Sequence, residues 1–393
     1  MKLGIPQFAK VPAHAWIRSW TDRALIAGFA LLLVAPSVAS LFDWNPYGLL
    51  GENRNLASLP VLNEQPLAKW PGIIDGYFRD HFGLRNAFVH ANNVVLRLWL
   101  HVSAEALVLG KDGWTFFRGP NERIFENHLG LDPLSGPQLD FWKSYLEERQ
   151  RNRATRGIKS LFVIAPDKQS IYPEMLPDQY APRGQTRVDQ LMAYLRETHS
   201  PVNIVDLRPV LLKAKGEGLL YFPNDSHWNG RGYFAAYREI SNHMRQWFPD
   251  LPVQRLGVDY GIKRTFSNIG EWGHVALPDE NLKYPSDLLV PIAGKAASVL
   301  APDLPPRFPN PIAPWLTAKS TRSVNGRHRL LILHDSFMSY GVADRTEGPL
   351  TRDFEATLSI GRYLQDAAVY ELEGKFHPDV VVEEWVERQM VAP

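Results

Sequence analysis

The chain of 393 residues contains no cysteine. This absence excludes disulfide bonds, cysteine nucleophiles and thiolate zinc sites, although it assigns no cellular compartment. An excess of charge is also missing, because 43 basic residues face 42 acidic ones and the net charge is +1. No broad basic field therefore marks the chain as a nucleic-acid-binding protein. Hydrophobic residues make up 45%, which is enough for a packed core in one large domain or two ordinary ones.

Charged side chains are absent from Ala24 to Phe42. A run of this length can cross a bilayer, since about 20 apolar residues are needed. Basic residues precede the run and Asp43 follows it. We therefore expect residues 1–23 to stay in the cytoplasm, residues 24–42 to form a transmembrane signal anchor, and the rest to be exported. The alternatives are cleavage by signal peptidase at Ser37-Val-Ala39 and a buried core helix.

From residue 137 to the end, short apolar runs alternate with helical patterns. Strands are expected at 161–165, 202–205, 330–333 and 380–382, and helices at 139–153, 188–195 and 234–248. This alternation predicts an α/β domain with a three-layer arrangement and a mostly parallel sheet. Residues 43–136 are expected to form an entry segment packed on that domain, with a helix over 88–100. The proline-rich stretch 278–325 is expected to be a long surface excursion.

A serine follows the buried strand expected at 330–333. Ser336 thus lies at the carboxyl end of a strand, where open α/β sheets place their ligand crevices. A serine hydroxyl is a weak nucleophile until a nearby base takes its proton. His227 is the best candidate base, because Asp225, two residues earlier, can accept its Nδ1 proton and orient the ring. The alternative roles are a helix cap for Ser336 and a loop hydrogen bond for Asp225.

A metal site is the next competing interpretation of the same residues. Asp225, His227, His274 and His334 could supply nitrogen and oxygen ligands, but no His-x-x-x-His or Glu-x-x-His spacing supports such a site. Gly230-Arg-Gly232 does not open a nucleotide fingerprint, because it lacks a third spaced glycine and follows a polar loop. We therefore expect neither a metal nor a soluble cofactor.

The two polar segments resemble motifs of a known family. Asp225-Ser-His-Trp-Asn229, with Asp335-Ser336-Phe337 downstream, is similar to the SGNH-hydrolase-like acetyltransferases of bacterial exopolysaccharide gene clusters, among them the alginate O-acetyltransferases. Supporting segments follow in the family's order: Glu52-Asn-Arg-Asn-Leu-Ala57, Asp80-His-Phe82 with Arg85, Gly110-Lys-Asp-Gly-Trp114, Ala165-Pro-Asp-Lys168, Ile171-Tyr-Pro-Glu174, Val205-Asp-Leu-Arg-Pro209, and Pro378-Asp-Val-Val-Val382 with Glu387-Arg388. The resemblance runs from about residue 50 to the end. It implies an SGNH-hydrolase-like domain behind an amino-terminal membrane anchor.

The resemblance also implies a reaction. Ser336 would be the nucleophile, His227 the base and Asp225 the carboxylate that orients it. The acetyl group would come from a membrane-bound O-acyltransferase partner and pass through Ser336 to a hydroxyl of a secreted polysaccharide. An acyl-serine intermediate divides one transfer into two easier steps. The protein would be a single-pass protein of the bacterial inner membrane, with its catalytic domain in the periplasm, working with other exopolysaccharide biosynthesis proteins.

Further residues are candidates for oxyanion or substrate contacts. The backbone N–H of Ser336 is a natural oxyanion donor, and a second donor is expected near Gly270. Tyr340, Arg362 and Trp228 are candidates for substrate contacts, while a packed tyrosine and a solvated arginine are the structural alternatives.

The sequence departs from the family pattern in two places. His334 stands where the family often has a small residue, which puts the shape of the serine turn in question. Gly270-Glu-Trp-Gly273 stands where the family tends to have Gly-Asp-Leu, which puts the oxyanion and acceptor contacts in question.

Two other functions remain open at the sequence level. A polysaccharide O-acetylesterase would use the same three residues and differ only in passing the acyl group to water. A non-catalytic, glycan-binding scaffold of the export complex would form no acyl adduct on Ser336. The near-zero net charge does not favour an acidic polymer such as alginate over a neutral one.

Overall fold

The computed structural model describes residues 20–42, 44, 57–60, 66–98, 107–119, 123–267, 284–292, 299–300, 318–338, 348–362, 364 and 366–391. The chain divides into two compact units, Met1–His101 and Val102–Pro393. The predicted entry segment 43–136 is therefore shared between them, with residues 43–101 in the first unit and 102–136 in the second. Its packing on the main domain stays a prediction.

The first unit consists of helices. They are α1 (Trp20–Leu41), a 3-10 turn η1 (Leu67–Lys69), α2 (Trp70–His81) and α3 (Arg85–Leu98). Helix α1 has 22 residues and a window of mean hydropathy 2.2, and it is the one described helix that is long and apolar enough to cross a membrane. Its bounds agree closely with the run predicted from the missing charges. The helix expected over 88–100 is α3.

The second unit is built around a seven-stranded sheet with the order β4-β3-β11-β9-β10-β8-β7. The strands are β3 (Lys159–Ala165), β4 (Ile204–Asp206), β7 (Val299–Leu300), β8 (Lys319–Arg322), β9 (Arg329–His334), β10 (Ala356–Gly361) and β11 (Val380–Val386). The five strands from β4 to β10 run parallel, whereas β8 and β7 are antiparallel additions at one edge. The prediction of a mostly parallel sheet is confirmed.

The helices of this unit are α4 (Ile124–His128), α5 (Gly136–Ala154), α6 (Lys168–Ile171), α7 (Arg187–Glu197), α8 (Arg208–Ala214), α9 (Gly230–Met244), α11 (Ser336–Met338), α12 (Pro349–Asp353) and α13 (Asp366–Phe376). Short 3-10 turns are η2 (Lys111–Gly113), η3 (Pro173–Met175), η4 (Asp178–Tyr180), η5 (Lys215–Glu217) and η8 (Glu387–Gln389).

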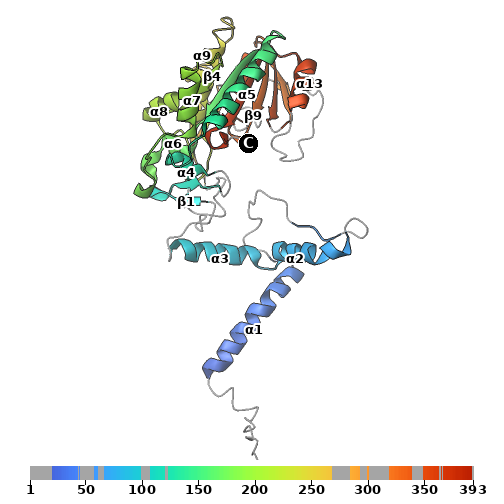
Figure 1. Cartoon of the computed structure of the whole chain (residues 1–393). Helices are drawn as coiled ribbons and strands as arrows, with labels where there is room; N and C mark the ends of the chain where they lie inside the picture. The colour runs from blue at the N-terminus through green and yellow to red at the C-terminus, as the bar shows by residue number, and fades with distance from the viewer. Residues whose placement is uncertain are drawn as a thin grey trace, which may run out of the picture. The chain divides into compact units, whose positions relative to one another are not determined.

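Helices cover both faces of the sheet (Figure 1). On one face, alternate strand residues such as Val163 and Ile332 share a core with α8 and α9. On the other face, their neighbours Phe162 and Leu331 pack against α5 and α7, or against α13. Because neighbouring side chains of a strand point to opposite faces, apolar runs such as Leu330–Leu333 serve both layers at once. The predicted three-layer α/β architecture is confirmed.

Two antiparallel hairpins accompany the sheet. The first pairs β1 (Leu107–Leu109) with β2 (Thr115–Phe117), and the second pairs β5 (Tyr260–Ser267) with β6 (Tyr284–Pro291). Strands β6, β7 and β8 all fall within the stretch 278–325, so the predicted surface excursion contains strands that its weak periodicity did not indicate. Strand β6 begins with Tyr-Pro-Ser-Asp and β8 reads Lys-Ser-Thr-Arg, and polar residues and proline are common in edge and hairpin strands.

A buried carboxyl group ends α12. The two oxygens of Asp353 accept hydrogen bonds from the Tyr237 hydroxyl at 2.6 Å and from the Gln254 side-chain amide at 2.8 Å. Burial outweighs these bonds and raises the pKa of Asp353 to about 8. The folded protein therefore holds a proton at Asp353 at neutral pH, where the unfolded chain would have released it.

We expect the folded state to become less stable as the pH rises, because the buried Asp353 carboxyl group then has to lose its proton. The folded pKa lies above the ordinary value of 3.8, so the contribution is complete below about pH 4 and is lost towards about pH 8. Asp353→Asn keeps the side-chain shape without titrating. Relative to the variant, the wild type should lose about 1–3 kcal/mol of unfolding free energy between about pH 5 and pH 8, measured by urea denaturation.

Asp178→Asn is the matched control, because Asp178 is exposed and its pKa is lowered, so it does not titrate in this range. Parallel pH profiles for wild type and Asp353→Asn would contradict the prediction.

Candidate active site

The carboxyl ends of the parallel strands lie side by side along one end of the sheet. The candidate residues of the serine turn follow strand β9 at this end. Strand β9 ends at His334 and is followed by Asp335 and Ser336. The side chains around Ser336 are buried, whereas Ser336 itself is partly exposed. The structure thus presents this hydroxyl at a turn of an otherwise buried segment, in the place where α/β proteins bind their ligands.

The carboxylate of Asp335 holds the serine turn in place. Its Oδ1 accepts the backbone N–H of Phe337 at 2.9 Å, and its Oδ2 accepts that of Val386 at 2.7 Å. The N–H of Asp335 donates to Glu384 Oε2 at 3.0 Å. The turn is therefore fastened by directional hydrogen bonds to the end of β11.

His334, the residue that departs from the family pattern, is completely buried. Its Nδ1 lies 2.7 Å from the carbonyl oxygen of Asp335, and its Nε2 lies 2.7 Å from the hydroxyl of Ser359 on β10. A carbonyl oxygen only accepts, so Nδ1 carries the proton in this contact. The imidazole ring thus braces the serine turn from below instead of facing the crevice.

Asp225 and His227 form the pair predicted from their spacing. His227 Nδ1 lies 2.7 Å from Asp225 Oδ1, and the same oxygen accepts the backbone N–H of His227 at 2.9 Å. The His227 side chain is 13% exposed and that of Asp225 is 16% exposed, while the Nε2 atom of His227 is itself buried. A carboxylate in this position fixes the ring orientation and favours the tautomer with the proton on Nδ1.

The loop that carries this pair is closed by its own backbone. Tyr221 and Trp228 form an antiparallel bridge, and Phe222 N–H donates to the carbonyl of His227 at 3.2 Å. After the loop, the Asn229 side chain caps α9 by accepting the N–H groups of Arg231 and Gly232.

The glycines of Gly230-Arg-Gly232 allow close packing at the start of α9. A Cβ on Gly230 would lie 2.2 Å from the backbone nitrogen of Leu289 in β6. A Cβ on Gly232 would lie 2.3 Å from the carbonyl oxygen of Leu220. Both distances are shorter than atoms tolerate, so packing accounts for the two glycines.

The loop and the serine turn meet through aromatic rings. The centroids of the His227 and Phe337 rings are 4.9 Å apart, and the indole N–H of Trp228 donates to the Phe337 carbonyl at 3.0 Å. The structure therefore places the His227 ring against the residue that follows Ser336, although the two polar segments lie more than 100 positions apart in the sequence. This juxtaposition is the one that the chemistry of a serine nucleophile requires.

The other predicted contact residues have different outcomes. Trp228 is 0% exposed, so its proposed contact with substrate is wrong for this structure, and it lies beneath the site as a support. Arg362 follows β10 at the same sheet edge, where its guanidinium lies 3.9 Å from the centroid of the Trp385 ring and hydrogen-bonds to Gln389. Gly270 and Tyr340 lie outside the described residues and stay predictions.

Buried carboxyl groups surround the serine turn. Burial raises the pKa of Asp167, raises that of Glu384 well above its ordinary value, and raises that of Glu387 to about 7. Arg388 pairs with Asp167, and the neighbouring Asp335 further raises the pKa of Glu384. The raised pKa of Glu384 favours its neutral form beside Asp335.

Lys168 is a functional candidate that sequence reasoning did not single out, although its segment Ala165-Pro-Asp-Lys168 belongs to the resemblance. The side chain is 2% exposed. Its ammonium group donates to the carbonyls of Phe222, Pro223 and Asp225 at 3.1, 2.9 and 2.7 Å. A single charged group thus gathers the carbonyls of the loop that presents Asp225 and His227.

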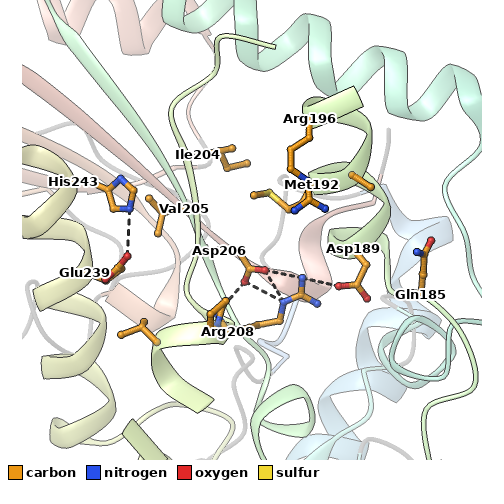
Figure 2. Close-up of a pocket in the computed structure, with 13 residues that line it drawn as sticks. Gln185, Asp189, Met192, Arg196, Ile204, Val205, Asp206, Arg208, Glu239 and His243 are labelled. Atoms are coloured by element: carbon orange, nitrogen blue, oxygen red, sulfur yellow. Dashed lines mark hydrogen bonds and ion pairs between the residues drawn. The ribbon is translucent and has the colours of Figure 1, made fainter. Parts of the chain in front are cut away.

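A hollow of about 570 Å³ lies elsewhere in this unit, beside edge strand β4. Figure 2 shows that Arg208 lies between Asp206 and Asp189, and that His243 faces Glu239. None of the residues that line it belongs to the loop or to the serine turn. Its charged groups are largely paired with one another, so we place the candidate chemistry at the serine turn.

Among the described residues, no group of three or more His, Asp or Glu side chains is arranged to hold a metal ion. His274, a member of the competing metal hypothesis, lies outside them.

Replacing Lys168 by Met tests its role in holding the loop. The change leaves three inward-facing carbonyls without their charged donor, and we expect the free energy of unfolding to fall by about 2–4 kcal/mol. Chemical denaturation measures the loss. The matched control is Lys215→Met, because Lys215 also lies over an aromatic ring and binds a carbonyl, but is more exposed. An equal loss in both variants would show that Lys168 has no special role.

Comparison with known proteins adds sequence evidence. Residues 107–275 match the family model described as SGNH hydrolase-like domain, acetyltransferase AlgX. The matched range includes Asp225 and His227 and ends before Ser336. The chain is also 24% identical over 244 residues to the probable alginate O-acetylase AlgJ of Pseudomonas aeruginosa. That match covers 62% of this chain and 57% of the relative, which is less than two thirds of its length.

Similar solved structures include the O-acetyltransferase domain of Pseudomonas putida AlgJ, with a TM-score of 0.44 and 16% identity over 72% of this chain and 92% of that one. Bacillus cereus PatB1 gives a TM-score of 0.47 and 14% identity over 73% of this chain and 97% of that one. The family match, together with the parallel sheet flanked by helices, confirms the resemblance drawn from the motifs. Residues 107–275 are therefore similar to the SGNH hydrolase-like acetyltransferase domain, and the chain resembles the alginate-type O-acetyltransferases.

Proposed function

We propose that this protein is an O-acetyltransferase that moves an acetyl group through Ser336 onto hydroxyls of a secreted bacterial polysaccharide. The observation that supports the proposal best is the packing of His227, oriented by Asp225, against the residue next to Ser336. The family match and the probable alginate O-acetylase among the relatives favour acetyl transfer over other acyl chemistry.

In the first half of the reaction, Ser336 Oγ attacks the carbonyl carbon of the donor's acetyl group while His227 Nε2 takes the hydroxyl proton. Asp225 stabilises the imidazolium that results. When the tetrahedral intermediate collapses, the bond to the donor breaks and the donor leaves with the proton from His227. The acetyl group then remains on Ser336 as an ester.

In the second half, a sugar hydroxyl attacks the acetyl-serine ester. His227 takes the proton of that hydroxyl and returns it to Ser336 Oγ as the ester bond to serine breaks. The sugar leaves as its acetyl ester, and the enzyme regains its starting protonation state. No cofactor enters this cycle.

We assign the oxyanion role to the backbone N–H of Ser336. The N–H groups on either side of it already donate to carboxyl groups, that of Asp335 to Glu384 and that of Phe337 to Asp335. A rigid donor at this turn would stabilise the negative oxygen of both tetrahedral intermediates. The second donor near Gly270 belongs to the proposal as an expectation from the sequence.

The proposed cellular location of the protein is based on helix α1. We propose that α1 is a single-pass anchor in the inner membrane and that the catalytic unit faces the periplasm. Basic residues lie before the span, which favours a cytoplasmic amino terminus. The acetyl donor would then be a membrane-bound O-acyltransferase, and the acceptor an exopolysaccharide of the alginate type handled with the other proteins of its biosynthesis.

Trapping the acyl-serine intermediate tests the proposal. The full chain in detergent is incubated with an activated acetyl ester, and intact mass spectrometry follows the gain of one acetyl group. We expect the group to map to Ser336 and to be absent from Ser336→Ala and His227→Ala. Asp225→Asn should slow its formation by about 10²–10⁴-fold, because the ring loses its orienting carboxylate.

Ser200→Ala is the matched control, since Ser200 lies away from the loop and the serine turn and donates to Glu147. Wild-type protein that is folded by circular dichroism yet neither gains the group nor consumes the ester would favour a glycan-binding scaffold. Turnover of the adduct by water alone, with no acetylated sugar when oligosaccharides are added, would favour an esterase.

A further inference from the structure

Helices α2 and α3 of the first unit expose an aromatic surface. Phe78, Phe82 and Phe88 are 65%, 47% and 43% exposed, and Leu67 just before α2 is 75% exposed. Phe78 lies in the last turn of α2, and Phe82 directly follows the helix as its C-cap. The rings of Phe82 and Phe88 stack with centroids 6.1 Å apart. We call Leu67, Phe78, Phe82 and Phe88 the aromatic patch.

The junction of α2 and α3 rests on helix α1. A Cβ on Gly83 would lie 1.8 Å from the carbonyl oxygen of Pro36 and 2.6 Å from the hydroxyl of Ser40. The Ser40 hydroxyl also reaches the carbonyl of His81 at 3.5 Å. Only glycine permits so close an approach, so this contact fixes the depth along α1 at which α2 and α3 lie (Figure 1).

That depth corresponds to the border of a membrane. The 22 residues of α1 span about 33 Å, close to the roughly 30 Å of a hydrocarbon core. Pro36 lies five residues before the end of α1 at Leu41, which is about 8 Å along the helix axis. Trp20 at one end of α1 and Trp44 beyond the other are 83% and 62% exposed, as in the aromatic belts that mark both surfaces of a bilayer.

Basic side chains accompany the patch. Lys69, Arg79 and Arg85 lie on the same two helices or at their starts. Arg79 pairs with Asp75 at 2.8 Å where both side chains are mostly exposed. Aromatic residues beside basic ones are the composition of helices that lie in the headgroup region of a membrane.

We propose that α2 and α3 lie flat in the membrane interface, with the aromatic patch inserted among the lipids of the same bilayer that α1 spans. This inference rests on the proposed membrane anchorage and deepens it. The catalytic unit begins at Val102, four residues after α3 ends at Leu98. The interfacial helices therefore lie between the span and the catalytic unit in the order of the chain.

The absence of cysteine in the chain makes a labelling test direct. Single cysteines replace Phe78 or Phe88 in the full-length protein, carry an environment-sensitive fluorophore, and are reconstituted in nanodiscs of zwitterionic and anionic phospholipids. Leu33→Cys, in the middle of the exposed surface of α1, reports membrane insertion. Asp178→Cys, whose side chain is 94% exposed in the catalytic unit, reports bulk water.

We expect lipids brominated near the headgroup to quench the Phe78 and Phe88 labels at least threefold more than the Asp178 label. Aqueous iodide should quench them at least threefold less. Lipids brominated deep in the acyl chain should quench the Leu33 label most. Replacing the remaining phenylalanines of the patch by serine should return the Phe78 label to the behaviour of the Asp178 label.

Labels at Phe78 and Phe88 as open to iodide as the Asp178 label, with Leu33 still in lipid, would overturn the inference and leave the anchor intact. Shielding that arises only when a membrane-bound O-acyltransferase is added would overturn it in favour of a protein interface. A Leu33 label in water would overturn the anchorage and the interfacial position together. Acyl-serine formation is measured separately, so failure of the proposed chemistry is distinguished from all three outcomes.

Discussion

A buried hydrogen bond between Trp228 and Phe337 joins the two halves of the candidate site. The indole N–H of Trp228 donates to the carbonyl of Phe337 at 3.0 Å, and both groups are buried. One partner follows His227 and the other follows Ser336. An indole left without its partner in this environment would cost about 1–3 kcal/mol, so the bond favours the one arrangement in which base and serine turn face each other. The loop and the sheet edge are built to preserve that arrangement.

The loop and the serine turn are held by different physical means. Lys168 gathers three loop carbonyls around one ammonium group, whereas Asp335 fastens the serine turn by accepting two backbone N–H groups. The Lys168 ammonium group therefore holds the loop that carries His227, and the Asp335 carboxyl group holds the turn at the end of β9. Both use charge-assisted hydrogen bonds, which are stronger than neutral ones and fix direction as well as distance.

The local sequence pattern predicted most of the helices and strands of the main domain, but it did not predict all of the residues that they contact. The apolar runs of β3 and β9 and the alternation with helices predicted the parallel sheet, and the spacing of Asp225 and His227 predicted their contact. Strand β10, with Thr357 and Ser359 between its apolar residues, gave no such signal. Arg149 and Arg153 on α5 look like solvated side chains, yet they are buried against Glu383 and Glu373. Their partners lie more than 200 residues away, and no local periodicity encodes that pairing. The role of Lys168 was not predicted for the same reason. Trp228 was predicted to contact substrate because its burial depends on packing against Phe337, which is distant in the sequence.

The acidic cluster beneath the serine turn has a physical cost that the fold reduces in two ways. Burying Asp167, Asp335, Glu384 and Glu387 as four charges would be strongly unfavourable. Arg388 forms an ion pair with Asp167, and the raised pKa of Glu384 favours its neutral form beside Asp335. The result is a set of fixed hydrogen-bond donors and acceptors at the carboxyl ends of the strands. Apolar side chains alone would not fix the orientation of the serine turn there. A nucleophile on such a framework needs little reorganisation when charge develops during acyl transfer, because the surrounding dipoles are already in place. The same polar framework fixes the turn that carries Ser336, since the buried neighbours on both sides of this serine are held by their own hydrogen bonds and packing.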